Sequence, residues 1–316
     1  MGKEISAVIC THNRAHYLTK AISSLTEQDL PNDIYEIIVV DNRSSDKTRD
    51  VVESFAGMGN IRYLYEPVVG LSHARNRGWR NARSPYVAYL DDDAVANPAW
   101  LGRILKVFKT TDPSPGCVGG MVAPIWEAPR PTWLGDAIAC SLTILDWSDT
   151  PHVVRNLNSE WLVGANIAFP QKLLEILDGF TPHLDRSGSR LLSSGDIFLE
   201  KQIQKADYTC FYHPEIAVSH HIPASRLTQS WFIRRYYFQG ISNAAMQLLS
   251  QSPSKRRRLR LAAQYATSFL RQPRCLLSMI VSTKNPERFT QKCFNLITLG
   301  HVVGLLSLPH RPYAEN

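Results

Sequence analysis

The stretch YVAYLDDDAVANPAWL, residues 86–101, decides the fold, because it sets three adjacent aspartates directly after a short apolar run. The run at 86–90 is typical of a buried strand. Asp91, Asp92 and Asp93 repel one another when they are ionised, so crowding them at one point carries an electrostatic cost. The other elements of the chain indicate what offsets that cost.

Predicted strands and helices alternate over the first hundred residues. The runs ISAVIC at 5–10 and EIIVV at 36–40 predict two further strands, and IRYLYE at 61–66 is a candidate fourth. Between them, residues 15–28 and 44–55 place their apolar residues on one helical stripe. Strands that alternate with helices predict βαβ units and an α/β fold with a mostly parallel central sheet.

Each of the three main strands ends in polar residues, at 11–13, 41–42 and 91–93. In an open α/β sheet, ligands bind beyond the carboxyl ends of the strands, so we expect these groups to share one edge. Helix capping explains the triplet poorly, since Asn97 can cap the following helix by itself. A D-x-D cluster at a strand end suits Mg²⁺ or Mn²⁺, which take carboxylate oxygens and would remove the repulsion.

Several common enzyme motifs are missing from the sequence. The first turn, CTHNRAH, has no glycine, which excludes a dinucleotide-binding G-x-G-x-x-G there. A phosphate-binding G-x-x-x-x-G-K-[ST], H-E-x-x-H and G-x-S-x-G are also absent. Hydride transfer, P-loop ATP hydrolysis, zincin proteolysis and α/β-hydrolase chemistry therefore lose support.

Composition fits a folded globular protein with an anionic partner. The 316 residues carry a net charge of +7, and Lys255–Arg258 with Arg260 form a basic run. The six cysteines form no C-x-x-C pair, which favours buried, reduced thiols. With neither a signal-peptide pattern nor an eighteen-residue apolar run, we expect a cytoplasmic protein.

Five segments, in order and spacing, resemble family-2 glycosyltransferases with the GT-A fold. They are ISAVICTHNRAHYLTKAISSLTEQ, EIIVVDNRSSDKT, GLSHARNRGWRNARSPYVAYLDDD, WLVGANIAF and SSGDIFLEKQI, and the similarity covers roughly residues 4–240. The resemblance implies a Rossmann-like nucleotide-sugar-binding sheet flanked by helices. We expect a catalytic domain over 1–225, with a nucleotide-sugar half at 1–95 and an acceptor half at 96–225, followed by a helical, basic region over 226–316.

The resemblance also implies roles for residues that match the family's motifs. The residues expected to contact the nucleotide sugar are Thr11, Asn13, Asp41, Arg75, Asn76, Asp91, Asp92 and Asn166. The implied metal ligands are Asp91, Asp93 and His220, with the adjacent His221 as an alternative to His220. Asp196 matches the general base, although Gly195 stands where a second acid is common.

These roles agree with the chemistry of glycosyl transfer. A metal ion and Arg75 can neutralise the leaving nucleotide diphosphate, and Asp196 can accept the acceptor's proton. One base opposite the leaving group predicts inversion at the anomeric carbon. The Q-x-x-R-W motif of processive synthases is absent, which favours transfer of a single sugar.

We therefore expect an inverting glycosyltransferase of polysaccharide or glycolipid biosynthesis that uses Mn²⁺ or Mg²⁺. Its expected donor is a nucleotide-diphosphate sugar, a UDP-sugar before others, and its expected acceptor is a glycan or lipid-linked sugar. No nucleic-acid partner is expected, and the C-terminal basic region is a candidate for peripheral contact with the inner face of a membrane.

Two other classes remain open. A metal-dependent nucleotidyltransferase or phosphohydrolase fits the sheet but leaves the GAN and SGD segments unexplained. A non-catalytic binder of nucleic acid or an anionic surface fits the basic run but gives the aspartates no purpose.

Overall fold

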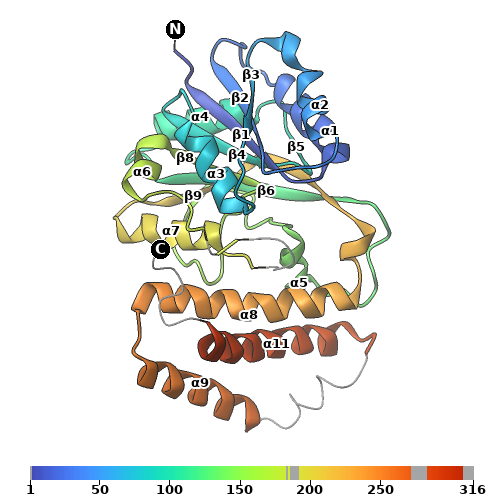
Figure 1. Ribbon diagram of the computed structural model, residues 1–316, viewed down its shortest axis with the longest axis vertical. Coiled ribbons are helices and arrows are strands. Elements are labelled where there is room, and N and C mark those ends of the chain that lie inside the picture. The colour runs from blue at the N-terminus through green and yellow to red at the C-terminus, as the bar shows by residue number, and fades with distance from the viewer. Residues whose placement is uncertain (1, 183, 186–191, 272–282, 309–316) are drawn as a thin grey trace. The chain divides into compact units, whose positions relative to one another are not determined.

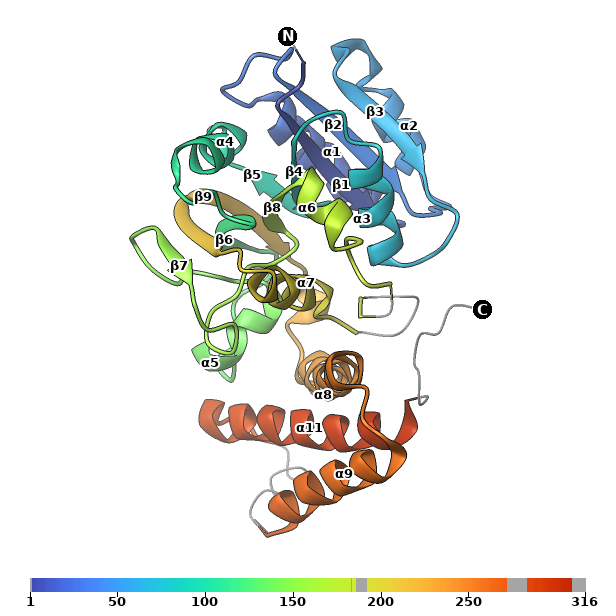
Figure 2. The ribbon, with the colours of Figure 1, turned by 90° about the vertical axis from the view of Figure 1, so that its left-hand side faces the viewer.

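A computed structural model of the chain describes residues 2–182, 184–185, 192–271 and 283–308 (Figures 1 and 2). It divides into two compact units. Unit 1 comprises Met1–Ile125, Thr143–Pro182 and Gly195–His221; unit 2 comprises Trp126–Leu142, His183–Ser194 and Ile222–Asn316. Segments 126–142 and 183–194, which lie inside the expected domain 1–225, thus belong to unit 2.

A nine-stranded mixed sheet forms the centre of unit 1. Its first four strands are parallel in the order β3-β2-β1-β4: β3 (Ile61–Tyr65), β2 (Tyr35–Asp41), β1 (Ile5–Thr11) and β4 (Tyr86–Asp91). The path continues through β8 (Asn166–Pro170), β6 (Cys117–Trp126), β9 (Cys210–Ile222) and β5 (Ala94–Ala96), with β7 (His152–Val154) beside β9. Pairing beyond β4 is antiparallel where β8 meets β4 and β6, and where β9 meets β5 and β7. The α/β prediction is confirmed, and its parallel part is limited to the first four strands.

Helices cover both faces of the parallel strands, which explains why β2 is buried at all seven positions. One face packs on α1 (Ala15–Thr26), α2 (Thr48–Glu53) and α4 (Trp100–Thr110). The other face packs on α3 (Leu71–Arg80), α6 (Gln171–Ile176) and α7 (Gly195–Lys205). Residues Ile37 and Val39 point to the first core while Ile38 and Val40 point to the second, as the alternation of a strand requires. Short 3₁₀ turns lie at Ala56–Met58 in unit 1 and at Cys140–Leu142 and Ala224–Arg226 in unit 2.

Unit 2 is mainly helical, with α5 (Asp136–Ala139), α8 (Gln229–Gln251), α9 (Lys255–Leu270) and α11 (Pro286–Ser307). Figure 1 shows α8, α11 and α9 side by side. The backbones of α8 and α11 meet at two glycines: a Cβ on Gly240 would lie 2.1 Å from the oxygen of Ile297, and one on Gly300 would lie 2.0 Å from that of Tyr237. Among the described helices, none has the length and apolar character to cross a membrane.

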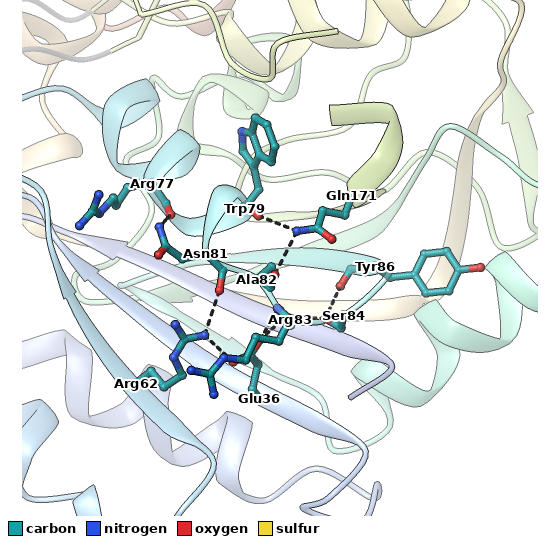
Figure 3. Close-up of polar contacts among 11 residues, drawn as sticks. Glu36, Arg62, Arg77, Trp79, Asn81, Ala82, Arg83, Ser84, Tyr86 and Gln171 are labelled. Carbon is teal, nitrogen blue, oxygen red and sulfur yellow. Dashed lines mark hydrogen bonds and ion pairs between the residues drawn. The ribbon is translucent and has the colours of Figure 1, made fainter. Parts of the chain in front are cut away.

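A buried polar network ties the amino ends of the strands together (Figure 3). The Glu36 carboxylate accepts hydrogen bonds from the Ser6 hydroxyl at 2.7 Å, the Arg83 backbone N–H at 2.7 Å and the Arg62 guanidinium at 2.8 Å. Arg62 also donates to the oxygen of Asn81, just after α3. Burial by itself raises the pKa of Glu36, but these hydrogen bonds and the Arg62 charge outweigh it and hold the pKa below its usual value.

We predict that Glu36→Gln destabilises the protein by about 1–3 kcal/mol at neutral pH, because a charged acceptor is replaced and buried donors lose their partner. Since the folded-state pKa is lowered, this stabilisation is present above the unfolded pKa and is lost as the pH falls through the folded one. The difference in unfolding temperature between the parent protein and the variant should therefore shrink as the pH is lowered from 7. Glu53→Gln, at an exposed ion pair with Arg49, is the matched control and should change little.

Candidate active site at the carboxyl ends of β1, β2 and β4

The sheet brings the three predicted polar strand ends to one edge. In the parallel register Thr11 lies beside Asp41, and Cys10 lies beside Asp91. The carboxyl ends of β1, β2 and β4 therefore meet where the sequence places its polar residues, as the arrangement of an open α/β sheet requires.

The D-x-D cluster is completed by a residue from far along the chain. Strand β5 pairs with β9 so that Ala94 lies opposite His220, and the backbone N–H of His221 donates to the oxygen of Asp93 at 2.8 Å. Nε2 of His220 then lies 3.2 Å from Oδ1 of Asp93. Ligand atoms of Asp91, Asp93 and His220 all lie within 4.8 Å of one another. The geometry thus brings His220 to the cluster, whereas the ring of His221 lies against Tyr17.

These three side chains fit a hard divalent cation. Carboxylate oxygens with one imidazole suit Mn²⁺ or Mg²⁺, and no thiolate lies among them. The imidazole is buried, and its Nδ1 has no hydrogen-bond partner among the described residues. The Asp91 side chain remains one-third exposed, so the cluster is open on one side.

Arg14 neutralises part of the aspartate charge, and the sequence analysis did not identify it. Its Nη1 lies 3.0 Å from Oδ1 of Asp92 and its Nη2 lies 2.5 Å from Oδ2 of Asp93. Burial raises the pKa of Asp92 to about 7, against the opposing charge of Arg14 and with a further increase from Asp93. The available signal was position: Arg14 follows the same first turn that holds Thr11 and Asn13.

The residues expected at the nucleotide base lie around the β1 and β2 turns. The Asp41 carboxylate accepts the Ser44 backbone N–H and the Tyr63 hydroxyl, each at 2.7 Å. Burial, the hydrogen bond to Asp41 and its charge raise the pKa of Tyr63 to about 12. Asn13 is exposed and accepts from the Ser45 N–H, while Thr11 is buried.

Arg75 lies on α3, between the aspartates and the GAN segment. Its guanidinium is 3.8 Å from Asp91 and lies over the Phe180 ring at 5.1 Å. A Cβ on Gly164 would lie 1.8 Å from Nη2 of Arg75, so only a glycine allows this approach. The adjacent Asn76 bonds both backbone groups of Phe180, at 2.7 and 2.9 Å. Asn76 thus fixes the segment that carries the ring under Arg75.

Asp196 sits at the first turn of α7, where the helix dipole favours a negative charge. Its Oδ2 accepts the backbone N–H of Gly164 at 3.0 Å, and its side chain is half-buried. Gly164 is therefore a link between the carboxylate of Asp196 and the cation of Arg75.

The Asn166 amide is turned into the core. It is completely buried: its Nδ2 donates to the oxygens of Met121 at 3.0 Å and Ile216 at 2.7 Å, and its Oδ1 accepts from Nε1 of Trp100 at 2.8 Å. Both amide hydrogens and the amide oxygen of Asn166 thus make hydrogen bonds inside unit 1, and these bonds anchor the end of the GAN segment.

The site therefore combines a candidate metal cluster, a buried arginine and a half-buried carboxylate at the edge of a mixed sheet. The fold that carries this site is of the GT-A class of glycosyltransferases, and two solved structures share it. A mannosyltransferase from Pyrobaculum calidifontis, solved with GDP-Man and Mn²⁺, has a TM-score of 0.56 at 22% identity, over 78% of this chain and 64% of that one. TarS 1–349 of S. aureus has a TM-score of 0.55 at 15% identity, over 96% and 90%.

The sequence comparisons agree with this class. Residues 6–156, just under half of the chain, match the model of Glycosyl transferase family 2. A glucosyl-dolichyl phosphate glucuronosyltransferase of Haloferax volcanii is 24% identical over 252 residues, 78% of each chain. A validoxylamine A glucosyltransferase of Streptomyces hygroscopicus is 33% identical over 117 residues, which span 36% of this chain and 28% of that relative.

We predict that Asn166→Ala unfolds at a markedly lower temperature, with a loss of about 3 kcal/mol or more, since each orphaned buried group costs about 1–3 kcal/mol. The measurement is thermal unfolding without any ligand, where a residue that only contacts a donor would have no effect. Asn158→Ala, at an exposed position, is the control. Equal midpoints for the Asn166 and Asn158 variants would show that the buried amide does not anchor this segment.

Proposed function

We propose that the protein is an inverting, metal-dependent glycosyltransferase that moves one sugar from a nucleotide-diphosphate sugar to an acceptor hydroxyl. The observation that carries the proposal is the convergence of Asp91, Asp93 and His220 within 4.8 Å, with Arg75 in contact with Asp91. Asp91, Asp93 and Arg75 lie in the segment 6–156 that matches the family 2 model, and the fold that brings His220 to them is similar to that of the solved mannosyltransferase.

Asp91, Asp93 and His220 would hold Mn²⁺ or Mg²⁺, which stabilises negative charge on a leaving diphosphate. Arg75 adds a second positive charge at the same place, and its burial strengthens that charge's effect. Asn76 acts indirectly, by holding the segment on which the Arg75 guanidinium rests.

Asp196 is the proposed general base. As the acceptor oxygen forms its bond to the anomeric carbon, the bond from that carbon to the diphosphate oxygen breaks and the hydroxyl proton passes to the Asp196 carboxylate. A single displacement of this kind inverts the anomeric configuration. The Gly164 N–H bond holds the carboxylate in a fixed orientation for the transfer.

Thr11, Asn13 and Asp41 would face the nucleotide base, with Asp41 held by Tyr63 and Ser44. We propose a UDP-sugar as the first donor to test, and a GDP-sugar as the second because the mannosyltransferase neighbour contains GDP-Man. A nucleotidyltransferase or phosphohydrolase would release a nucleoside monophosphate or pyrophosphate, whereas the proposed reaction releases a nucleoside diphosphate.

Two variants should separate metal binding from chemistry. Asp93→Asn should abolish the rise in unfolding temperature that Mn²⁺ plus a nucleotide sugar produces, since it removes a ligand. Asp196→Asn should keep that rise and lower the rate of nucleoside diphosphate release by about 10²–10⁴-fold, the usual contribution of a general base. The unfolding temperature is measured with UDP- and GDP-sugars, with and without Mn²⁺. The rate of nucleoside diphosphate release is then measured, and the product is analysed by NMR.

The matched control is Asp178→Asn, at an exposed carboxylate paired with Arg80, and it should behave as the parent protein. Near-parental turnover by the Asp196 variant would remove that residue from the base role. A retained anomeric configuration would exclude the single displacement, and a Mn²⁺ response that survives in the Asp93 variant would exclude the metal assignment.

We also propose that α9 contacts an anionic membrane surface, where lipid-linked acceptors reside. Lys255, Arg256, Arg257 and Arg260 are exposed beside Leu259, which is 59% exposed. Arg258 is the exception, because it is buried and donates to the oxygens of Leu305 and Leu308 at the end of α11. The Haloferax volcanii relative is named for glucosyl-dolichyl phosphate, a lipid-linked sugar, which supports a lipid-linked acceptor.

Replacing Arg256 and Arg257 together by alanine should weaken co-sedimentation with phosphatidylserine vesicles by roughly 30-fold, at about 1 kcal/mol for each basic side chain. Replacing the exposed Lys20 and Arg49 of unit 1 removes the same charge and should leave binding unchanged. Equal losses in both pairs would point to net charge alone, and no binding by the parent protein would exclude the membrane contact.

A further inference from the structure

A second cluster of metal-ligating side chains lies on the α3–α6–α7 face of the sheet in unit 1. Cys117 opens β6, Cys210 opens β9, and Glu200 lies in the middle of α7. All three are fully buried, and their sulfur and carboxylate ligand atoms lie within 4.8 Å of one another. The sequence analysis expected these cysteines only as separate buried thiols.

Glu200 is costly to bury in this environment. Its Oε2 accepts the backbone N–H of Leu162 at 3.0 Å, but its Oε1 has no hydrogen-bond partner among the described residues. The surrounding core is apolar and includes Leu162, Leu199 and Ile203. An unpaired carboxyl oxygen in such a core lowers the stability of the fold by about 1–3 kcal/mol or more. Buried polar atoms therefore usually have a hydrogen-bond partner or a bound ion.

The chemistry of the three groups indicates which ion would compensate it. Two cysteine sulfurs with one carboxylate oxygen form a ligand set that favours Zn²⁺ over Mg²⁺ or Mn²⁺. Zinc–sulfur bonds of about 2.3 Å place two ligand sulfurs about 3.8 Å apart in a tetrahedral site. Ligand atoms that now lie within 4.8 Å of one another would therefore need to approach one another by about 1 Å. The Leu162 N–H would orient the carboxylate from outside, as the partners of metal ligands commonly do.

We propose that Cys117, Cys210 and Glu200 form a zinc site that is separate from the D-x-D cluster. Binding releases the two thiol protons and any proton on the carboxyl group, and all three groups then coordinate the ion as anions. No oxidation or reduction is involved. The inference does not depend on the proposed transferase activity.

The site would have a structural consequence for the reacting residues. Glu200 lies four residues after Asp196, one turn further along α7. An ion shared by Glu200, β6 and β9 would fasten α7 to the sheet and so fix the helix that carries Asp196. Glu200 is then a positioning residue, whose loss should affect metal retention first and activity only through the helix.

Cobalt provides a test that distinguishes this site from the D-x-D cluster. Protein produced with Co²⁺ should show the near-ultraviolet charge-transfer absorption of a thiolate–cobalt bond, which the oxygen and nitrogen ligands of the aspartate cluster cannot produce. Protein produced with Zn²⁺ should retain one zinc per chain after brief chelation, measured by elemental analysis. Cys117→Ser and Cys210→Ser should each weaken the cobalt band and the zinc retention.

Glu200→Gln is the second variant, because it keeps the side-chain shape if a serine variant fails to fold. It should release zinc to a chelator at least about 10–100-fold more readily, the range seen when even outer-shell groups of metal sites change. Cys293→Ser is the control: this buried cysteine of unit 2 belongs to neither described metal-ligating cluster, and its replacement should leave the band unchanged.

Three outcomes would overturn the proposal. The first is the absence of a thiolate–cobalt band in folded protein, and the second is a band that persists in the Cys117 and Cys210 variants. The third is a thiol count of four in denatured, unreduced protein in place of the six cysteines of the sequence, with a Cys117–Cys210 disulfide found by peptide mapping.

Discussion

The repulsion among three adjacent carboxylates at the end of β4 is the constraint on which the site depends. Two unit charges about 4 Å apart interact by about 4 kcal/mol at the effective dielectric of a protein surface, so the cluster needs cations close by. The chain supplies the cation of Arg14 from the turn after β1, and the pairing of β5 with β9 brings the candidate metal ligand His220 alongside. The first turn and the last strand of unit 1 are thus both required at one point.

The sequence predicted those parts of the fold whose pattern is local. Strands β1, β2 and β4 are short apolar runs that end in polar residues, and parallel strands necessarily present those ends at one edge. The antiparallel half was not predicted, because β8 pairs with β4 and β9 pairs with β5 across long separations in sequence. Choosing between His220 and His221 depends on that pairing, so the residues alone could not decide it.

Single residues show the same division between local pattern and tertiary contact. Asn166 stands in a motif of the family, yet its amide is occupied by Trp100, Met121 and Ile216, which no spacing rule reveals. Glu200 reads as an ordinary charged position of a helix, and only its burial beside two cysteines distinguishes it. The sequence therefore shows which polar residues lie near a motif but not where their side chains point. That direction depends on which neighbouring groups need a hydrogen bond.

Gly164 shows how the backbone can set the distance between two groups that are proposed to act in the reaction. Its N–H holds Asp196, and its missing side chain gives Arg75 the space to lie against the same peptide. In the proposed reaction, these two residues act at opposite ends of the exchange: one receives the acceptor proton and the other stabilises the leaving diphosphate. Because the Gly164 peptide contacts both Asp196 and Arg75, it holds the two side chains at a fixed separation. A direct ion pair between them would instead neutralise the base and the cation together. The glycine is needed here for close approach, since any Cβ would displace the guanidinium that the Phe180 ring and Asp91 position.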